Sequence, residues 1–191
     1  MDRHFTFRTG ILGMVLVSGI GFPPVLNAKV FRTLPEVMSE ELKGHPDAEW
    51  KAESIYLKPE EVRQIESKAQ VKAESALVVR QVLRAKSGKA LETIYAETHK
   101  VRTHPETVMV VVGPESKIIR CEVLSFDEPL EYLPKQNWYE TFRGRALDQE
   151  LNLKSKIPLV TGASLSARAM LEASRRILAT HETLQKRGVN P

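Results

Sequence analysis

The sequence predicts an α+β fold, in which an antiparallel sheet of about four or more strands packs against a C-terminal helix and shorter helices. Three observations lead to it. β-rich runs follow one another across short turn signals, which favours an antiparallel meander. Small and apolar residues near the C-terminus recur at helical spacing, which is typical of a helix that buries one face. Finally, 191 residues, of which 42% are hydrophobic, are enough for one domain with its own core.

Four runs rich in β-branched and apolar residues predict strands over residues 76–84, 90–98, 107–112 and 118–126. A hairpin through Gly88 joins the first two runs, and the turn signal at Gly113 joins the last two. Within the third run, residues 108–112 are almost continuously apolar. Such a strand is expected at the centre of the sheet, covered on both faces and by the last helix on one of them.

Two short helices are predicted before the sheet. Pro35, followed by acidic residues and closed by Gly44, indicates the first, and residues 59–69 indicate the second. Trp138 and Phe142 are expected to cap the core, because large aromatic side chains are the costliest to leave in water.

The C-terminal helix is predicted to begin close to Ser164, after a small flexible turn. Its buried face is expected to comprise Ala163, Ala167, Met170, Ser174, Ile177 and Leu178, whereas Arg168, Arg175 and Arg176 fall largely elsewhere. The first N–H groups of a helix lack partners and the dipole is positive there, so a phosphate would be stabilised. A serine near an N-cap can equally be an ordinary capping side chain, and spacing alone leaves both interpretations open.

The residues around Ser164 resemble a known signature. Thr161-Gly162-Ala163-Ser164 is similar to the Ser/Thr-Gly-Ala-Thr motif of the FMN-binding domain family, which includes the flavin-carrying G and C subunits of Rnf and sodium-pumping NADH:quinone oxidoreductase complexes. Residues 98–107 and 126–134 also resemble stand-alone periplasmic members of that family, so the resemblance covers most of residues 30–186.

The resemblance implies that residues 29–191 form an FMN-binding domain, with the flavin phosphate held at Ser164 or esterified to its hydroxyl. It implies an exported electron carrier more than an enzyme with its own substrate. A FAD-dependent flavin transferase would then serve its maturation, and a membrane or periplasmic protein would be its redox partner. The expected cofactor-binding residues are Thr161, Gly162, Ala163, Ser164, Leu165, Ser166, His99, Arg102, Thr103 and His104.

The segment of residues 98–106 is expected to form a wall of the flavin site, because a flavin ring needs donors or charges near its polar edge. In the alternative interpretation, His99 ends a strand facing solvent and His104-Pro105 makes a turn. Gly162 is expected to let the backbone approach the phosphate closely.

Two departures from the family motif motivate an alternative function. Ser164 stands where the family has threonine, and it keeps the nucleophilic oxygen. Pro158 stands where the family's flavinylation motif usually carries aspartate, and it cannot supply a carboxylate. The alternative is a flavin-free binding or structural protein on the same scaffold, and noncovalent FMN is a further possibility.

The N-terminal residues 1–28 are predicted to be a secretory signal peptide, because Arg3 and Arg8 precede an apolar run that ends before Pro23. The run from Ile11 to Phe22 is shorter than the ~20 residues of a spanning helix, although an uncleaved anchor stays open. Export would place the domain in the periplasm or on the extracytoplasmic face of the inner membrane.

Other chemistries are disfavoured by what the sequence contains. The formal net charge is +4, with basic and acidic residues interspersed, which does not form the basic stripe of a nucleic-acid-binding protein. The single cysteine, Cys121, excludes both an intrachain disulfide and the Cys-x-x-Cys-His motif of a c-type haem. His99 and His104 lack further ligands at metal-site spacing. The Ser164 motif also lacks the second glycine of a hydrolase nucleophile elbow.

Overall fold

The computed structural model describes residues 29–153 and 155–188, and the predicted signal peptide, residues 1–28, lies outside these ranges. Within them, all paired strands are antiparallel and form one six-stranded sheet in the order β1-β6-β5-β4-β3-β2. The strands are β1 (Lys29–Val30), β2 (Ala48–Tyr56), β3 (Leu77–Ala85), β4 (Ala90–Lys100), β5 (Pro105–Val112) and β6 (Ile118–Phe126). The predicted fold class and the meander from β3 to β6 are confirmed.

The helices of the described residues are α1 (Leu34–Gly44), α2 (Pro59–Ala69), α3 (Gln136–Tyr139) and α4 (Ser164–Lys186), with the 3₁₀ turns η1 (Leu130–Tyr132) and η2 (Glu140–Phe142). Both predicted short helices are confirmed. A capping box starts α1, because the Thr33 hydroxyl accepts the Glu36 N–H at 3.4 Å and the Glu36 carboxylate accepts the Thr33 N–H at 2.7 Å. These reciprocal bonds satisfy two donors that would otherwise be unpaired.

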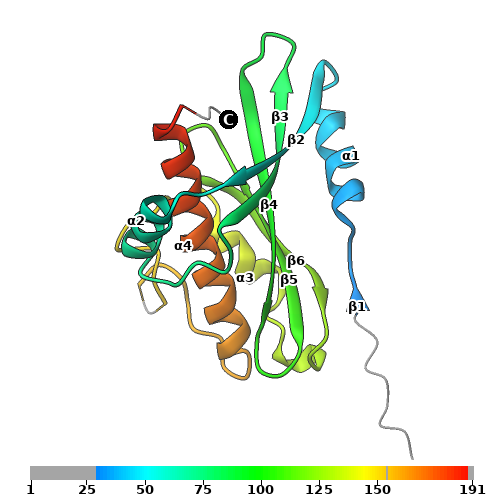
Figure 1. Cartoon of the computed structure of the whole chain (residues 1–191). Coiled ribbons are helices and arrows are strands. Elements are labelled where there is room, and N and C mark those ends of the chain that lie inside the picture. The colour runs from blue at the N-terminus through cyan, green and yellow to red at the C-terminus, as the bar shows by residue number, and fades with distance from the viewer. Residues whose placement is uncertain (1–28, 154, 189–191) are drawn as a thin grey trace, which may run out of the picture.

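Helices cover the two faces of the sheet, with α4 on one side and α1 on the other (Figure 1). Because side chains alternate along a strand, β5 contributes to both cores. Val108, Val110 and Val112 belong to the core beneath α4, whereas Met109 and Val111 belong to the core beneath α1. The prediction of a central strand, buried on both faces and covered by the last helix on one, is confirmed.

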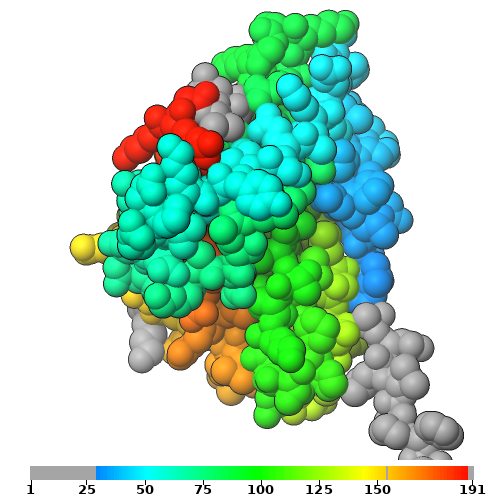
Figure 2. Space-filling view, in the orientation of Figure 1, coloured from blue at the N-terminus to red at the C-terminus, as the bar shows by residue number. Residues whose placement is uncertain are grey.

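The core beneath α4 extends into the segment that leads back from β6. Trp138 and Phe142 are both buried in it, which confirms their predicted position. Farther along α4, helix α2 packs against its outer side, where Ile65 and Ala69 join Ala179 and Leu184. Figure 2 shows α2 and the segment before β3 in teal over this part of the molecule, with the orange N-terminal part of α4 reaching the surface below them.

The strand β2 was not predicted from the sequence. Its residues mostly alternate between half-buried and exposed, and it carries the charged residues Glu49, Lys51 and Glu53. It lies at the edge of the sheet and pairs only with β3 among the described strands. An edge strand of this kind lacks the apolar run on which the prediction of the other strands depended, since charged side chains are common there.

The prediction for Arg176 was wrong. Its side chain is not on the solvated side of α4 but is buried against the sheet, where it forms a two-point pair with Glu97 on β4. The six residues expected on the buried face lie there: Ala163, Ala167, Met170, Ser174, Ile177 and Leu178. The buried surface of α4 is therefore wider than the spacing of its apolar residues indicated, because the sheet supplies a partner for the guanidinium.

Candidate functional site

The turn that leads into α4 depends on one glycine. Gly162 has a φ of +85°, a left-handed conformation that residues with a side chain rarely adopt. A Cβ at this position would meet no atom within 4 Å, so the backbone angle and not crowding requires glycine. The Ala163 N–H then bonds the Val160 carbonyl at 3.2 Å, and the Ala167 N–H opens the helix by bonding the Ala163 carbonyl at 3.0 Å. The turn therefore leaves the space beside Gly162 open.

The first turn of α4 has backbone N–H groups without an acceptor among the described residues. Its N-cap is Ala163, which has no capping side chain, and Ser164 is the first helical residue. No described residue accepts a hydrogen bond from the N–H groups of Ser164, Leu165 or Ser166. The exposed Ser164 hydroxyl likewise makes no hydrogen bond to a described residue. The capping interpretation of Ser164 is therefore wrong, whereas the prediction that the helix begins close to Ser164 is confirmed.

A small hollow lies directly beside this helix start. It has a volume of about 100 Å³ and is lined by Arg102, Tyr132, Gly162, Ala163, Ser164, Leu165 and Ser166. The Arg102 guanidinium, from the connection between β4 and β5, lies 4.7 Å from the centre of the Tyr132 ring. This cation–π contact holds a positive charge at the hollow. The fold thus brings Arg102 to the Ser164 loop from far away in the sequence.

A hydrogen bond joins the Tyr132 segment, which lines the hollow, to the first turn of α4. The Ser166 hydroxyl donates to the Tyr132 carbonyl at 2.6 Å, so this second serine points inward while Ser164 points out. Upstream, the Trp138 indole N–H donates to the Pro158 carbonyl at 2.8 Å and fixes the segment before the loop. Pro158 is itself exposed. The loop is therefore anchored on both sides of the exposed hydroxyl.

Thr103 and His104 do not line the hollow but hold the connection that carries Arg102. Their backbone N–H groups donate to one carboxylate oxygen of Glu128 at 2.7 and 2.9 Å, and the Thr103 hydroxyl donates to it at 3.2 Å. Burial raises the pKa of Glu128, but these hydrogen bonds outweigh burial, so the pKa is below its usual range. The ionised carboxylate thus fixes the shape of this connection.

His99 lies in a buried cluster of charges. Its Nε2 is 3.3 Å from a Glu106 oxygen and its Nδ1 is 3.6 Å from a Glu97 oxygen, with only 7% of its side chain exposed. Burial lowers the pKa of His99, but the two carboxylates outweigh burial and raise it to about 9. The interpretation of His99 as a solvent-facing residue is wrong. The prediction that His99 forms a wall of the site is not met at this hollow, because His99 is not among the residues that line it.

Two contributors to the site were not among the predicted residues. Tyr132 supplies the ring beneath Arg102, and Glu128 fixes the Arg102 connection. Both lie in the stretch of residues 126–134, in which no site residue was predicted from the sequence. A tyrosine and a glutamate next to prolines are typical of packed loops, and their role depends on contacts with residues far away in the sequence.

The hollow fits a phosphate group and not a whole flavin. Its volume lies below the roughly 300–1,000 Å³ of pockets that enclose complete ligands. The unpaired N–H groups, the Ser164 hydroxyl and the Arg102 guanidinium supply the donors that a phosphate needs. Exposed apolar side chains adjoin them, with Leu165 48% and Leu159 54% exposed. A flavin ring would extend beyond the hollow toward such surface.

Comparison of the chain with protein-family models, with curated proteins and with solved structures gives no match. In residues 29–153 and 155–188, no helix is long and apolar enough to cross a membrane. The same residues hold no group of three or more His, Cys, Asp or Glu side chains suited to a metal ion. The geometry around Ser164 is therefore the basis for the functional proposal.

Proposed function

We propose that this protein is an exported FMN-binding electron-transfer protein, with the flavin phosphate held at, or esterified to, Ser164 at the N-terminus of α4. One observation carries the proposal. The free hydroxyl of Ser164, the unpaired N–H groups of the first turn and the Arg102 guanidinium converge on one phosphate-sized hollow.

Electrostatics support an anion at this position. The start of a long helix favours a negative group by roughly 0.3–1 kcal/mol at exposed sites, and α4 has 23 residues. The guanidinium adds charge-assisted hydrogen bonds, which are about twice as strong as neutral ones. Noncovalent binding through these donors alone would be modest, because the hollow is open to solvent. An ester bond at Ser164 would prevent loss of the cofactor.

The flavin would supply the redox chemistry, since it passes electrons singly or in pairs. The residues of this chain would bind and orient it. The first turn of α4 would hold the phosphate, and the exposed Leu165 would offer apolar surface to the ring system. A cofactor so close to the surface is accessible to another protein, which suits an electron carrier more than an enzyme with an enclosed substrate site.

The proposal includes a location and partners. Residues 1–28 would direct the chain to the periplasm, where an FAD-dependent flavin transferase would move the FMN part of FAD to the Ser164 oxygen. The pyrophosphate bond of FAD would break as the phosphoester bond forms, AMP would leave, and the hydroxyl proton would be released. A membrane or periplasmic redox protein would exchange electrons with it. Pro158 is exposed in the stretch that precedes the acceptor serine, so a transferase could contact its side chain. A flavin-free protein on this scaffold is the second candidate, and the absence of a carboxylate at Pro158 favours it.

The test is to express the full chain with and without an FAD-dependent flavin transferase and to measure its intact mass and flavin fluorescence. We expect an FMN-sized mass increment that requires the transferase, disappears in Ser164→Ala and is retained in Ser164→Thr. Ser155→Ala is the matched control, because it removes an exposed serine hydroxyl that lies before the motif and does not line the hollow. An unmodified, colourless protein under both conditions, with no affinity for added FMN, would establish the flavin-free alternative instead.

A further inference from the structure

A larger cavity lies farther along α4, away from Ser164. It has a volume of about 360 Å³, which is within the range of small-molecule sites. It forms where two neighbouring strands separate. β3 pairs with β4 only from Arg80 onward, opposite Tyr95, whereas β4 continues to Lys100 beside β5 alone. The segment before β3 and the middle of α4 close the remaining sides.

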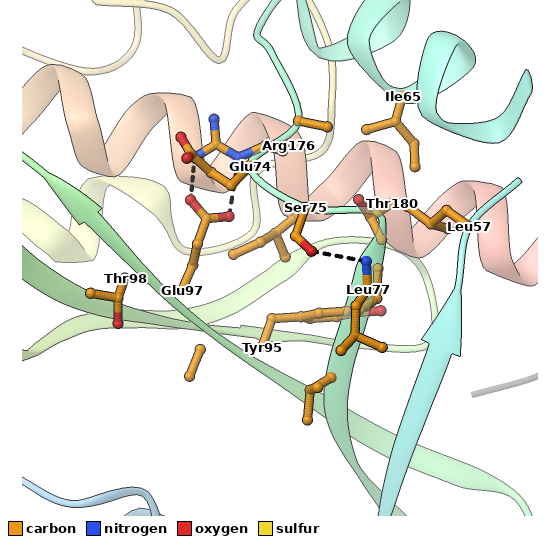
Figure 3. A pocket seen from close by; sticks show the side chains of 15 residues that line it. Leu57, Ile65, Glu74, Ser75, Leu77, Tyr95, Glu97, Thr98, Arg176 and Thr180 are labelled. Carbon is orange, nitrogen blue, oxygen red and sulfur yellow. Dashed lines mark hydrogen bonds and ion pairs between the residues drawn. The ribbon is translucent and has the colours of Figure 1, made fainter. Parts of the chain in front are cut away.

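The cavity is polar at one end and apolar at the other (Figure 3). Glu74, Glu97 and Arg176 gather at the polar end, and Leu57 and Ile65 lie at the opposite end. Val78 and Ile177 add further apolar lining, and Leu77 and Val79 at the rim are 38% and 51% exposed. This arrangement suits an elongated ligand with an apolar body and one polar head.

At the polar end, the protein itself already uses most of the arginine's donor directions: three Arg176 hydrogen bonds go to protein acceptors. Arg176 donates through Nε to Glu97 at 3.1 Å and through Nη1 to the Lys72 carbonyl at 3.2 Å. Its Nη2 bonds Glu97 and lies 3.6 Å from Glu74. The guanidinium thus already pairs with two carboxylates and a carbonyl, which leaves few of its five N–H groups for an anionic head.

Acceptors, in contrast, are in excess. Two carboxylates surround one guanidinium, and the Glu74 side chain is 53% exposed at the mouth. His99 contacts both Glu97 and Glu106 through its two ring nitrogens, and it does not line the cavity. On the side that faces β3, β4 has no strand partner beyond Tyr95 in the described part of the chain, and on such an edge alternate residues direct both their C=O and their N–H groups outward. A head that donates several hydrogen bonds is therefore favoured.

We infer that this cavity is a second ligand site, for a small amphipathic molecule with a primary ammonium head and an apolar body. The ammonium group carries three donors and a positive charge, which match the Glu74 carboxylate and its neighbouring acceptors. The apolar body occupies the space between Leu57, Ile65 and Ile177. The site does not depend on flavin. Ser164 and Arg176 are 12 residues apart on one helix, roughly 18 Å.

The experiment uses unmodified protein and hexylamine, with hexanol and hexanoate as probes of the same shape that differ only in the head. Methyl NMR of Leu57, Ile65, Val78 and Ile177 reports where each probe lies. We expect hexylamine to shift these methyls with a Kd on the order of 1 mM, given the few atoms it can bury. Hexanol should bind less tightly and hexanoate least.

Glu74→Gln is expected to weaken hexylamine binding by up to about fivefold and to leave hexanol unchanged, since an exposed pair is worth up to about 1 kcal/mol. Glu60→Gln is the matched control, because it removes an exposed carboxylate that does not line the cavity. The inference is overturned if hexylamine leaves the cavity methyls unshifted. It is also overturned if hexanoate binds more tightly than hexylamine, or if the two variants weaken binding equally.

Discussion

The backbone N–H of Thr103 donates to the Glu128 carboxylate at 2.7 Å, and the Thr103 hydroxyl donates to the same oxygen at 3.2 Å. These bonds join the connection between β4 and β5 to the segment that follows β6. Arg102 precedes Thr103 directly, so the carboxylate holds the backbone next to the residue whose guanidinium lies over Tyr132. A residue that never touches the hollow thus controls the charge beside it.

Replacing Glu128 tests this relationship. Glu128→Ala is expected to lower the free energy of unfolding by about 1 kcal/mol, because the part-buried N–H groups of Thr103 and His104 lose their acceptor. It should also weaken the binding of FMN more than Glu131→Ala, which removes an exposed carboxylate nearby. Chemical denaturation and FMN titration measure the two effects. Equal flavin affinity in both variants would show that Arg102 needs no such support.

The same carboxylate has a predicted pH dependence. Because the pKa of Glu128 is lowered in the folded state, its contribution is present above the unfolded pKa of about 4.3 and is lost as the pH falls below it. The difference in unfolding free energy between the wild type and Glu128→Ala should therefore shrink as the pH falls from about 5 to about 3, the range in which a glutamate normally becomes protonated.

Pro158→Asp is expected to increase the fraction of protein that carries flavin after expression with the transferase. Pro158 is exposed, so a carboxylate there is accessible and costs no burial. Its carbonyl bond to Trp138 is made by the backbone and is available to aspartate as well. Leu159→Asp, at the next exposed position, is the control and should have no such effect. Intact mass measures the fraction, and an unchanged value for Pro158→Asp contradicts the prediction.

His99 is expected to stabilise the fold only while it is protonated. Its folded pKa of about 9 exceeds the ordinary 6.5, so its contribution is complete below pH 6.5 and is lost as the pH rises toward 9. The difference in unfolding free energy between the wild type and His99→Gln should fall by on the order of 2–3 kcal/mol across this window. Urea denaturation at several pH values tests it, and a difference independent of pH would show that His99 is neutral.

His181 should have the opposite pH dependence. Burial, and then the charge of Arg80, lower its pKa to about 4, and its Nδ1 lies 3.1 Å from the Tyr95 hydroxyl. The neutral ring is favoured in the fold, so its contribution is present above pH 6.5 and is lost as the pH falls toward 4. The wild type should therefore lose stability on acidification more steeply than His181→Gln. NMR titration of the imidazole would give the pKa directly, and a value near 6.5 contradicts the prediction.

Much of the fold was predictable because local patterns agree with tertiary structure in most of the sheet. Helix α2 and strand β6 have the predicted bounds, because a proline marks the start of the helix and most residues of the strand are apolar. Strand β2 was missed because it is a charged edge strand. Arg176 was misplaced because its partner, Glu97, lies on β4, and no periodicity along α4 could indicate that residue.

The sequence by itself determined the fold class, the glycine turn before α4 and the start of that helix close to Ser164, because each depends on neighbouring residues. Only the tertiary structure decided that Ser164 caps nothing, that Arg102 and Tyr132 meet it, and that Glu128 fixes the Arg102 connection. These contacts join residues from separate strands, turns and a helix. Such contacts depend on how the elements pack, which spacing along a single chain does not encode.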